Sequence, residues 1–265
     1  MITDWDDAYA NGAHIDGADD IVADWSRRAS AFRSATESEQ ICGDANTRPF
    51  VDLYRPKSPT QGLTIIVHGG YWMAFSGRDF AHLARGAFTR KQAVAMVTYR
   101  LAPEVSVPAI TQDVARMVCE AAKRVNGPIR LVGHSAGGHL VTRMLCAGVL
   151  PNDIYARIAH VTSISGLHDL RPLMRTAMRD TLHLTGDIAC TESPALLCPV
   201  QGARVTCVVG ERERPEFIRQ TALLANIWHG LGARMRDVRI DNAHHFNVID
   251  GLEQPDSALM DLVLS

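Results

Sequence analysis

The chain has 265 residues, 46% hydrophobic and 21% charged, which provides enough apolar sequence for a sizeable core and excludes wholesale disorder. Its formal net charge of −2 and its scattered Lys and Arg residues argue against a nucleic-acid partner or an acidic membrane surface. The acidic start MITDWDDAYA lacks the apolar stretch of a signal peptide, and no apolar run reaches the length of a membrane span, so we expect a cytoplasmic protein. Six cysteines, none in a Cys-x-x-Cys pair, predict reduced thiols in the core.

Residues 1–35 predict a helical N-terminal extension, because Trp25, Ala29 and Phe32 recur at helical spacing; the extension is counted up to residue 45. From residue 48 onward, strand and helix patterns alternate. The first strand, at 50–54, alternates apolar and polar residues and is expected to be half-exposed. The later strands are predicted at 63–67, 93–99, 129–132, 159–164, 205–209 and 235–240, and the helices at 77–90, 108–125, 137–148, 215–231 and 255–264.

This alternation predicts one α/β domain over residues 1–265, with a mostly parallel central sheet and helices on both faces. In such sheets, ligands bind at the carboxyl ends of the strands. Residues 166–200 interrupt the alternation and are too long for a simple connection. We therefore expect them to form a small lid or cap over the site.

The segment Gly133-His134-Ser135-Ala136-Gly137 matches Gly-x-Ser-x-Gly, the sharp turn that presents a nucleophilic serine between a strand and a helix. A predicted strand precedes it and a predicted helix follows it, as the turn requires. The residues two positions before and after the serine must be small, because strand and helix approach closely there. The context favours a nucleophile at Ser135 over a chance match.

The sequence His68-Gly69-Gly70-Tyr71-Trp72 directly follows the predicted strand at 63–67. Glycines at a strand end let backbone N–H groups point toward a developing oxyanion, and the amide of Ala136 would be a further donor. We interpret the segment as an oxyanion loop rather than an ordinary Gly-Gly turn.

The base is expected late in the chain, where His244 and His245 follow the last predicted strand. We favour His245, which precedes Phe246, and assign His244 a structural role. A metal site is disfavoured, because adjacent side chains rarely converge on one ion.

The acid should follow the strand at 205–209, where the sequence offers three glutamates and no aspartate. Glu216 lies beyond Pro215, which is predicted to open a helix, so Glu211 and Glu213 remain on the loop. Asp241 is the alternative.

Six segments, HGGYW, YRLAPE, GHSAGGH, SGLHDLRPL, VGERERPEF and HHF, occur in this order. Together they resemble the kynurenine formamidase (arylformamidase) branch of the α/β-hydrolase superfamily, near the hormone-sensitive-lipase-like esterases. The resemblance covers residues 50–250. It implies an α/β-hydrolase fold and a serine hydrolase that needs no cofactor.

The resemblance also assigns roles by position. It implies Ser135 as nucleophile and His245 as base, with oxyanion donors at Gly69, Gly70 and Ala136. The family has an aspartate three residues after the strand-end glycine. This chain has Glu213 there, which favours Glu213 over Glu211 and departs from the family pattern.

These observations predict an acyl-enzyme hydrolase for a small-molecule carbonyl substrate, most concretely an aryl formamide such as N-formylkynurenine. A short-chain carboxylesterase is the first alternative, and a non-catalytic ligand-binding protein is the second. Tyr71, Trp72 and His134 are candidate substrate contacts, with packing beneath the cap as the alternative for Tyr71 and Trp72. No metal or cofactor is expected, and a homodimer is left open.

Overall fold

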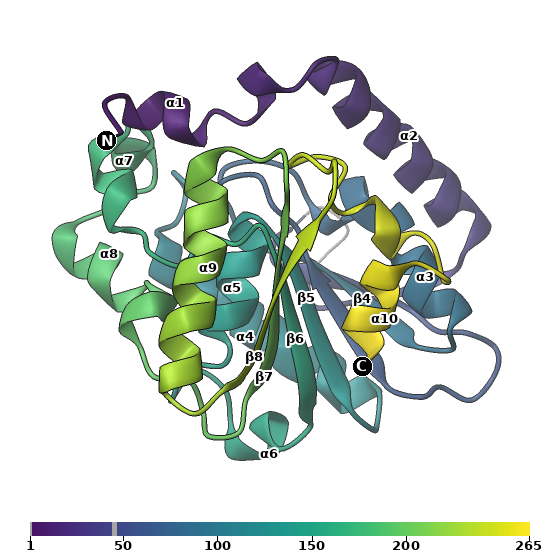
Figure 1. The fold of residues 1–265 in the computed structure, drawn as a ribbon. Helices are drawn as coiled ribbons and strands as arrows, with labels where there is room; N and C mark the ends of the chain where they lie inside the picture. The colour runs from purple at the N-terminus through teal and green to yellow at the C-terminus, as the bar shows by residue number, and fades with distance from the viewer. Residues whose placement is uncertain (1, 44–46) are drawn as a thin grey trace.

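The computed structural model describes residues 2–43 and 47–265. Within them, eight strands form one sheet in the order β1-β2-β4-β3-β5-β6-β7-β8 (Figure 1). The two strands at the β1 edge run antiparallel to their neighbours and the rest of the sheet is parallel. The strand bounds are β1 Ser38–Ile41, β2 Phe50–Tyr54, β3 Leu63–Val67, β4 Ala93–Thr98, β5 Ile129–His134, β6 Ile158–Ile164, β7 Arg204–Gly210 and β8 Arg234–Ile240.

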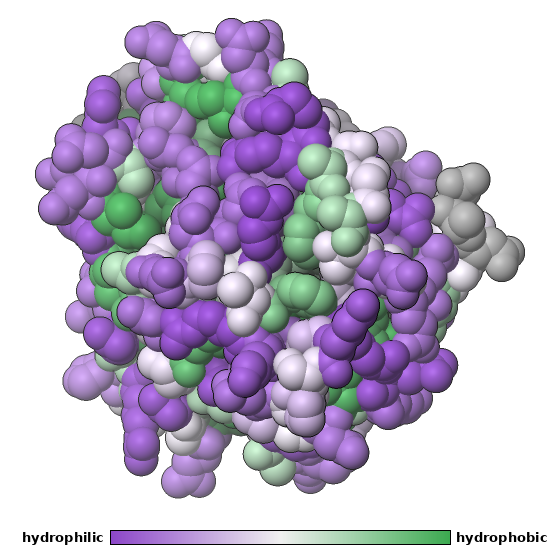
Figure 2. All heavy atoms as spheres, turned by 90° about the vertical axis from the view of Figure 1, so that its right-hand side faces the viewer, coloured by the Kyte–Doolittle hydropathy of each residue, from purple (hydrophilic) through white to green (hydrophobic). Residues whose placement is uncertain are grey.

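The helices cover both faces of the sheet (Figure 1). One face carries α4 Val107–Arg124, α5 Ala136–Arg143 and α9 Pro215–Gly230. The other carries α2 Ala18–Ala35, α3 Ala84–Thr89 and α10 Ala258–Leu264. Each face buries its own apolar layer, since alternate strand residues point to opposite sides. The surface over α2, α3 and α10 is mostly hydrophilic, with small separate hydrophobic areas (Figure 2).

The strand at 50–54 differs from the expectation, because all five of its residues are buried rather than half-exposed. Val51 and Leu53 pack into the apolar layer on one face of the sheet and Tyr54 into the layer on the other, so both faces of the strand are covered. Its polar residue, Asp52, is buried as an ion pair with Arg78, whose Nε lies 2.8 Å from Oδ2. The polar residue in this alternating strand therefore belongs to a buried ion pair and does not indicate a strand face exposed to solvent.

The N-terminal extension is helical as far as residue 35, with a short α1 at Trp5–Tyr9, a 3-10 turn η1 at Gly12–His14 and the long α2. It then forms β1, a strand that the helical pattern of residues 1–45 did not predict. The predicted helix at 77–90 is a 3-10 segment, η2 Gly77–Leu83, followed by α3. The predicted helix at 137–148 ends at Arg143.

Residues 166–200 form four short helical segments: η3 Arg171–Arg175, α7 Met178–Thr181, α8 Gly186–Thr191 and η4 Pro194–Leu196. They pack beside α1, α5 and α9. The buried Glu192 anchors them, because its carboxylate accepts hydrogen bonds from Arg143 and Thr111. The remaining short helices are α6 Asn152–Tyr155 and η5 Asp250–Leu252.

The cysteines are free thiols, but they are not all core residues as expected: Cys146 and Cys207 are buried, whereas Cys190 and Cys198 are exposed. No helix in the described part of the chain is long and apolar enough to cross a membrane.

Candidate active site

Ser135 lies at the sharp junction between β5 and α5, with φ 54° and ψ −117°. This strained backbone is held by its amide, which donates to the carbonyl oxygen of Ile164 at 2.8 Å. A Cβ on Gly133 would lie 2.0 Å from the oxygen of Gly137, and a Cβ on Gly137 would lie 2.0 Å from the oxygen of Val67. Larger side chains would therefore collide with backbone at both positions, which explains the two glycines of the motif.

The loop after β3 lies directly beside Ser135. A Cβ on Gly69 would lie 3.1 Å from the Cβ of Ser135. Within residues 2–43 and 47–265, no group accepts a hydrogen bond from the amides of Gly69, Gly70 or Ala136. These are the three amides that the sequence proposed as oxyanion donors, and they remain available to a ligand.

Two buried aromatic residues hold this loop from behind. His68 donates from Nδ1 to the carbonyl oxygen of Gly69 at 2.7 Å, and Tyr99 donates to the carbonyl oxygen of His68 at 3.1 Å. Their rings stack with centroids 4.2 Å apart. Burial lowers the pKa of His68 to about 4, so the ring is neutral at physiological pH.

His245 and Glu213 form a buried pair. His245 donates from Nδ1 to Oε2 of Glu213 at 2.6 Å. The other carboxylate oxygen, Oε1, accepts from the hydroxyl of Ser165 at 2.5 Å and from the amide of Gly210 at 2.8 Å. Glu213 is thus fixed by three hydrogen bonds, and it fixes the His245 ring in turn.

The other candidates do not reach the His245 ring. Glu211 is exposed and accepts from the amide of Asn242. Asp241 is exposed, and His244 accepts from the backbone amides of Phe246 and Asn247 in a turn. Of the carboxylates weighed from the sequence, the structure places Glu213 at the imidazole.

His134 packs on the other side of His245, with ring centroids 4.7 Å apart. It donates from Nε2 to the backbone oxygen of His245 at 3.0 Å. Burial, together with the neighbouring His245, lowers the pKa of His134 well below its usual range. His134 is therefore a neutral side chain that holds the backbone of His245 and also lines the cavity described next.

Ser135 and His245 line a cavity of about 170 Å³. Most of its wall is apolar and comes from Gly70, Met73, Ala74 and from aromatic residues spread along the chain: Trp25, Tyr71, Phe75, Phe80 and Phe246, with His134 beside them. The ring of Trp25 lies 5.2 Å from that of Phe80 and 5.1 Å from that of Phe246. Helix α2 contributes Trp25 to this wall, whereas residues 166–200, expected as the lid, contribute none of the lining residues.

The two aromatic residues of the HGGYW segment have different surroundings. Tyr71 lines the cavity, and its hydroxyl donates to the backbone oxygen of Tyr9. Trp72 is fully buried away from the cavity and donates from Nε1 to Nδ1 of His139 at 3.3 Å. His139 donates from Nε2 to the backbone oxygen of Glu192 at 2.7 Å. The expectation of Trp72 as a substrate contact is thus corrected: it packs the oxyanion loop against α5.

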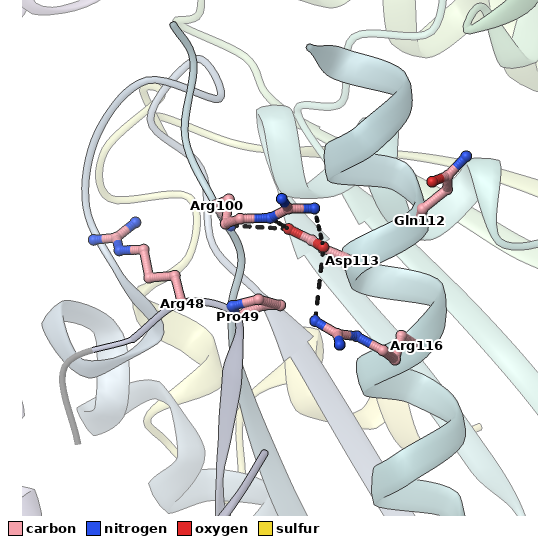
Figure 3. A pocket seen from close by; sticks show the side chains of 6 residues that line it. All are labelled: Arg48, Pro49, Arg100, Gln112, Asp113 and Arg116. Atoms are coloured by element: carbon pink, nitrogen blue, oxygen red, sulfur yellow. Dashed lines mark hydrogen bonds and ion pairs between the residues drawn. The ribbon is translucent and has the colours of Figure 1, made fainter. Parts of the chain in front are cut away.

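A second cavity, of about 430 Å³, lies away from Ser135 and is lined by Arg48, Pro49, Arg100, Gln112, Asp113 and Arg116 (Figure 3). In it, Asp113 binds Arg100 through two contacts of 2.8 Å and lies 3.9 Å from Arg116. The described residues that line this arginine cavity include no Ser, Cys or His. It has charge pairs but no nucleophile.

Known proteins resemble this chain in sequence and in fold. The family of the alpha/beta hydrolase fold matches residues 64–194. A kynurenine formamidase from Danio rerio is 26% identical, over 93% of this chain and 89% of that protein. A kynurenine formamidase from Salmo salar is 27% identical, over 81% of this chain and 76% of that protein.

Solved structures give the same fold. A protein from Silicibacter sp. TM1040, provisionally described as a thioesterase, is 43% identical, with 99% of each chain covered and a TM-score of 0.93. A thermostable carboxylesterase cloned from a metagenomic library has a TM-score of 0.69 at 19% identity, over 93% of this chain and 94% of that one.

The chain therefore has the α/β-hydrolase fold and is a hydrolase similar to the kynurenine formamidases. The predicted fold class, enzyme class and family resemblance are confirmed.

Two features of the site were missed from the sequence. Ser165, which donates to Glu213, follows β6 at the same strand edge and begins the SGLHDL segment; only that position could have indicated it. Trp25 was interpreted as one member of an apolar helix face. No local sequence pattern distinguishes a tryptophan that packs only in the core from one that also lines a cavity.

Proposed function

We propose that the protein hydrolyses an aryl formamide, such as N-formylkynurenine, through an acyl-enzyme on Ser135, with His245 as base and Glu213 as acid. The observation that carries the proposal is the convergence of three elements on one cavity. They are a strained serine, a buried His–Glu pair and a loop with available amides. The similarity to proteins named kynurenine formamidase supports the choice of substrate.

In the first half-reaction, Nε2 of His245 takes the proton from Ser135 as its oxygen attacks the formyl carbon. The C–N bond breaks, and the same proton passes to the leaving nitrogen to give an aromatic amine. In the second half-reaction, His245 activates a water molecule that attacks the formyl ester. Formate leaves and Ser135 recovers its proton.

Glu213 orients the ring and stabilises the imidazolium that forms in both steps. Because the carboxylate accepts from Ser165 and Gly210 as well, its position does not depend on His245 alone. The longer glutamate takes the place of the family's aspartate while still reaching Nδ1 at 2.6 Å.

The amides of Gly69, Gly70 and Ala136 would bind the oxygen that becomes negative in the tetrahedral intermediate. One such donor is typically worth about 10²–10³ in kcat, equivalent to about 3–4 kcal/mol of transition-state stabilisation. Trp72, through His139, and His68 keep the loop in place for this role.

The cavity supports an aromatic leaving group. An engineered apolar cavity of about 150 Å³ holds benzene, so the volume of about 170 Å³ is sufficient for one aryl ring. The rings of Trp25, Tyr71 and Phe246 offer edges and faces for such a ring.

A broad short-chain esterase is the alternative, because the same acyl-enzyme chemistry cleaves esters. The Silicibacter relative's description adds thioesters to this class. We would compare kcat/KM for N-formylkynurenine, 4-nitrophenyl acetate and acetyl-coenzyme A. We expect the formamide to be preferred; a preference for either other substrate by orders of magnitude would contradict the proposal.

Labelling by a fluorophosphonate separates an enzyme from a protein that only binds ligand. We expect one adduct on the wild-type protein and none on Ser135→Ala, both measured by intact mass. A folded wild-type protein that remains unlabelled would favour the non-catalytic alternative.

A further inference from the structure

A separate pocket of about 270 Å³ adjoins the Ser135 cavity. Tyr71 and Phe246 line both, so the two spaces lie side by side at these two residues. The rest of the pocket is built by the N-terminal segment and one residue of α7, namely Asp6, Tyr9, Ala10, Asn11, Gly12, Ala13 and Met178. The N-terminal segment therefore contributes a second compartment next to the proposed reaction centre.

The side-chain donors of this adjoining pocket are already engaged. Tyr9 donates to Glu216 at 2.8 Å, and Tyr71 donates to the backbone oxygen of Tyr9. Since the Tyr71 hydroxyl has given its proton, it must accept, and it does so from Nδ2 of Asn11 at 2.8 Å. This arrangement orients the Asn11 amide and leaves its Oδ1 without a partner in the described chain. The pocket is short of free side-chain donors.

Asp6 is the one charged residue among those that line the adjoining pocket. Its Oδ1 accepts from the amide of Ala177 at 2.8 Å, and it forms no ion pair with any described residue. The neighbouring Asp7 is different, because Arg214 and His14 both contact its carboxylate. Among residues 2–43 and 47–265, no cationic side chain pairs with the Asp6 carboxylate.

We propose that the adjoining pocket binds a positively charged amine on the side chain of an aryl substrate whose ring occupies the Ser135 cavity. This inference rests on the proposed function and specifies its substrate class. Asp6 supplies the counter-charge, and the faces of Tyr71 and Phe246 are suited to an ammonium group. The described residues that line the pocket include no Lys or Arg to pair with a carboxylate, so the amine is the group that this pocket would recognise.

Three related 2-formamidophenyl ketones test this assignment. One has an aminoethyl side chain, one has the matching ethyl side chain without the amine, and the third is N-formylkynurenine, which adds a carboxylate. We expect the wild-type protein to prefer the aminoethyl compound over the ethyl compound in kcat/KM, and to accept it at least as well as N-formylkynurenine.

Asp6→Asn is the informative variant, because asparagine can still accept from Ala177. We expect the aminoethyl-to-ethyl preference to fall about three- to fivefold, the upper range for an exposed ion pair. The preference of the wild-type protein should also fall in high salt, since screening weakens the exposed charge. Asp16→Asn, an exposed acid of the same segment outside the pocket, should leave the preference unchanged.

Binding to Ser135→Ala, measured by calorimetry with the aminoethyl compound, gives a readout that does not need turnover. We expect a weaker Kd in Ser135→Ala/Asp6→Asn than in Ser135→Ala. Equal Kd values, or equal substrate preferences in wild type and Asp6→Asn, would overturn the amine pocket while the proposed hydrolase remains. If wild type cleaves none of the three formamides, the proposed function itself fails.

Discussion

The cavity beside Ser135 has a volume of about 170 Å³, and the arginine cavity has a volume of about 430 Å³. The two cavities differ in the polar side chains that line them. In the smaller cavity a serine and a histidine open into an apolar space, and the acid is buried behind the histidine. In the larger one, the buried Asp113 binds the partly exposed Arg100 (Figure 3). Reactive groups in an apolar wall, rather than volume, indicate the site of chemistry.

The largest expected loss of activity comes from removing the carboxylate behind His245. Glu213→Ala should lower kcat about 10³- to 10⁴-fold, because loss of the group that orients the base has cost about 10⁴ in a serine protease. Glu211→Ala, two residues away and exposed, should change kcat less than about twofold, as is usual for a surface substitution. Steady-state kinetics on a formamide would measure both. Equal losses would mean that another carboxylate serves His245.

The next effect concerns the apolar wall. Trp25→Leu removes an aromatic face from the cavity and should raise KM for an aryl formamide up to about tenfold, since an aromatic pair contributes about 0.5–1.5 kcal/mol. The matched control is Phe32→Leu on the same helix, which packs on Tyr54 and Phe88 outside the cavity. It should reduce stability without changing KM. A KM that rises equally in both variants would show that the effect is not local.

The third prediction uses the neutral histidines that support the oxyanion loop. Burial lowers the pKa of both His68 and His139 to about 4, below the ordinary value of 6.5. Between these pH values the unfolded chain binds more protons, so the free energy of unfolding should fall as the pH decreases from 6.5 to 4. Each histidine contributes a slope of about 1.4 kcal/mol per pH unit.

Urea unfolding at several pH values would measure this slope. His139→Gln removes one titrating group and should lower the slope of the free energy of unfolding against pH by about 1.4 kcal/mol per pH unit. An unchanged slope in His139→Gln would contradict the assignment of a neutral, buried imidazole.

The smallest effect is expected in the arginine cavity. Arg100→Gln removes two contacts to Asp113 and should reduce stability by about 0.5–1 kcal/mol, because the arginine is more than a third exposed. Its kcat/KM should stay within about twofold of wild type, as for surface changes remote from a reaction centre. A tenfold loss of kcat/KM would show that the two cavities are coupled. The arginine cavity could then no longer be treated as independent of the chemistry at Ser135.

Much of the site was predictable because its signals are local. The glycines around Ser135 are dictated by backbone contacts two residues away, and strand-end positions place Gly69 and His245 at one edge of a parallel sheet. The order of nucleophile, acid and base along the chain restricted the expected acid to the short loop after the strand at 205–209. The strand and helix pattern gave the sheet and its covering helices, except for β1, which is short and partly exposed.

The family resemblance favoured Glu213, but only the tertiary structure shows which carboxylate reaches the imidazole and which aromatic residues line the cavity beside Ser135. Glu211 and Glu213 differ by two positions in the sequence, and only the folded loop turns one inward and the other to solvent. Trp25 and Phe246 are far apart in the sequence but in contact in the fold, so no periodic sequence pattern connects them. The physical reason is the same in each case: spacing determines which face a residue occupies, whereas contacts between distant segments depend on how the layers pack.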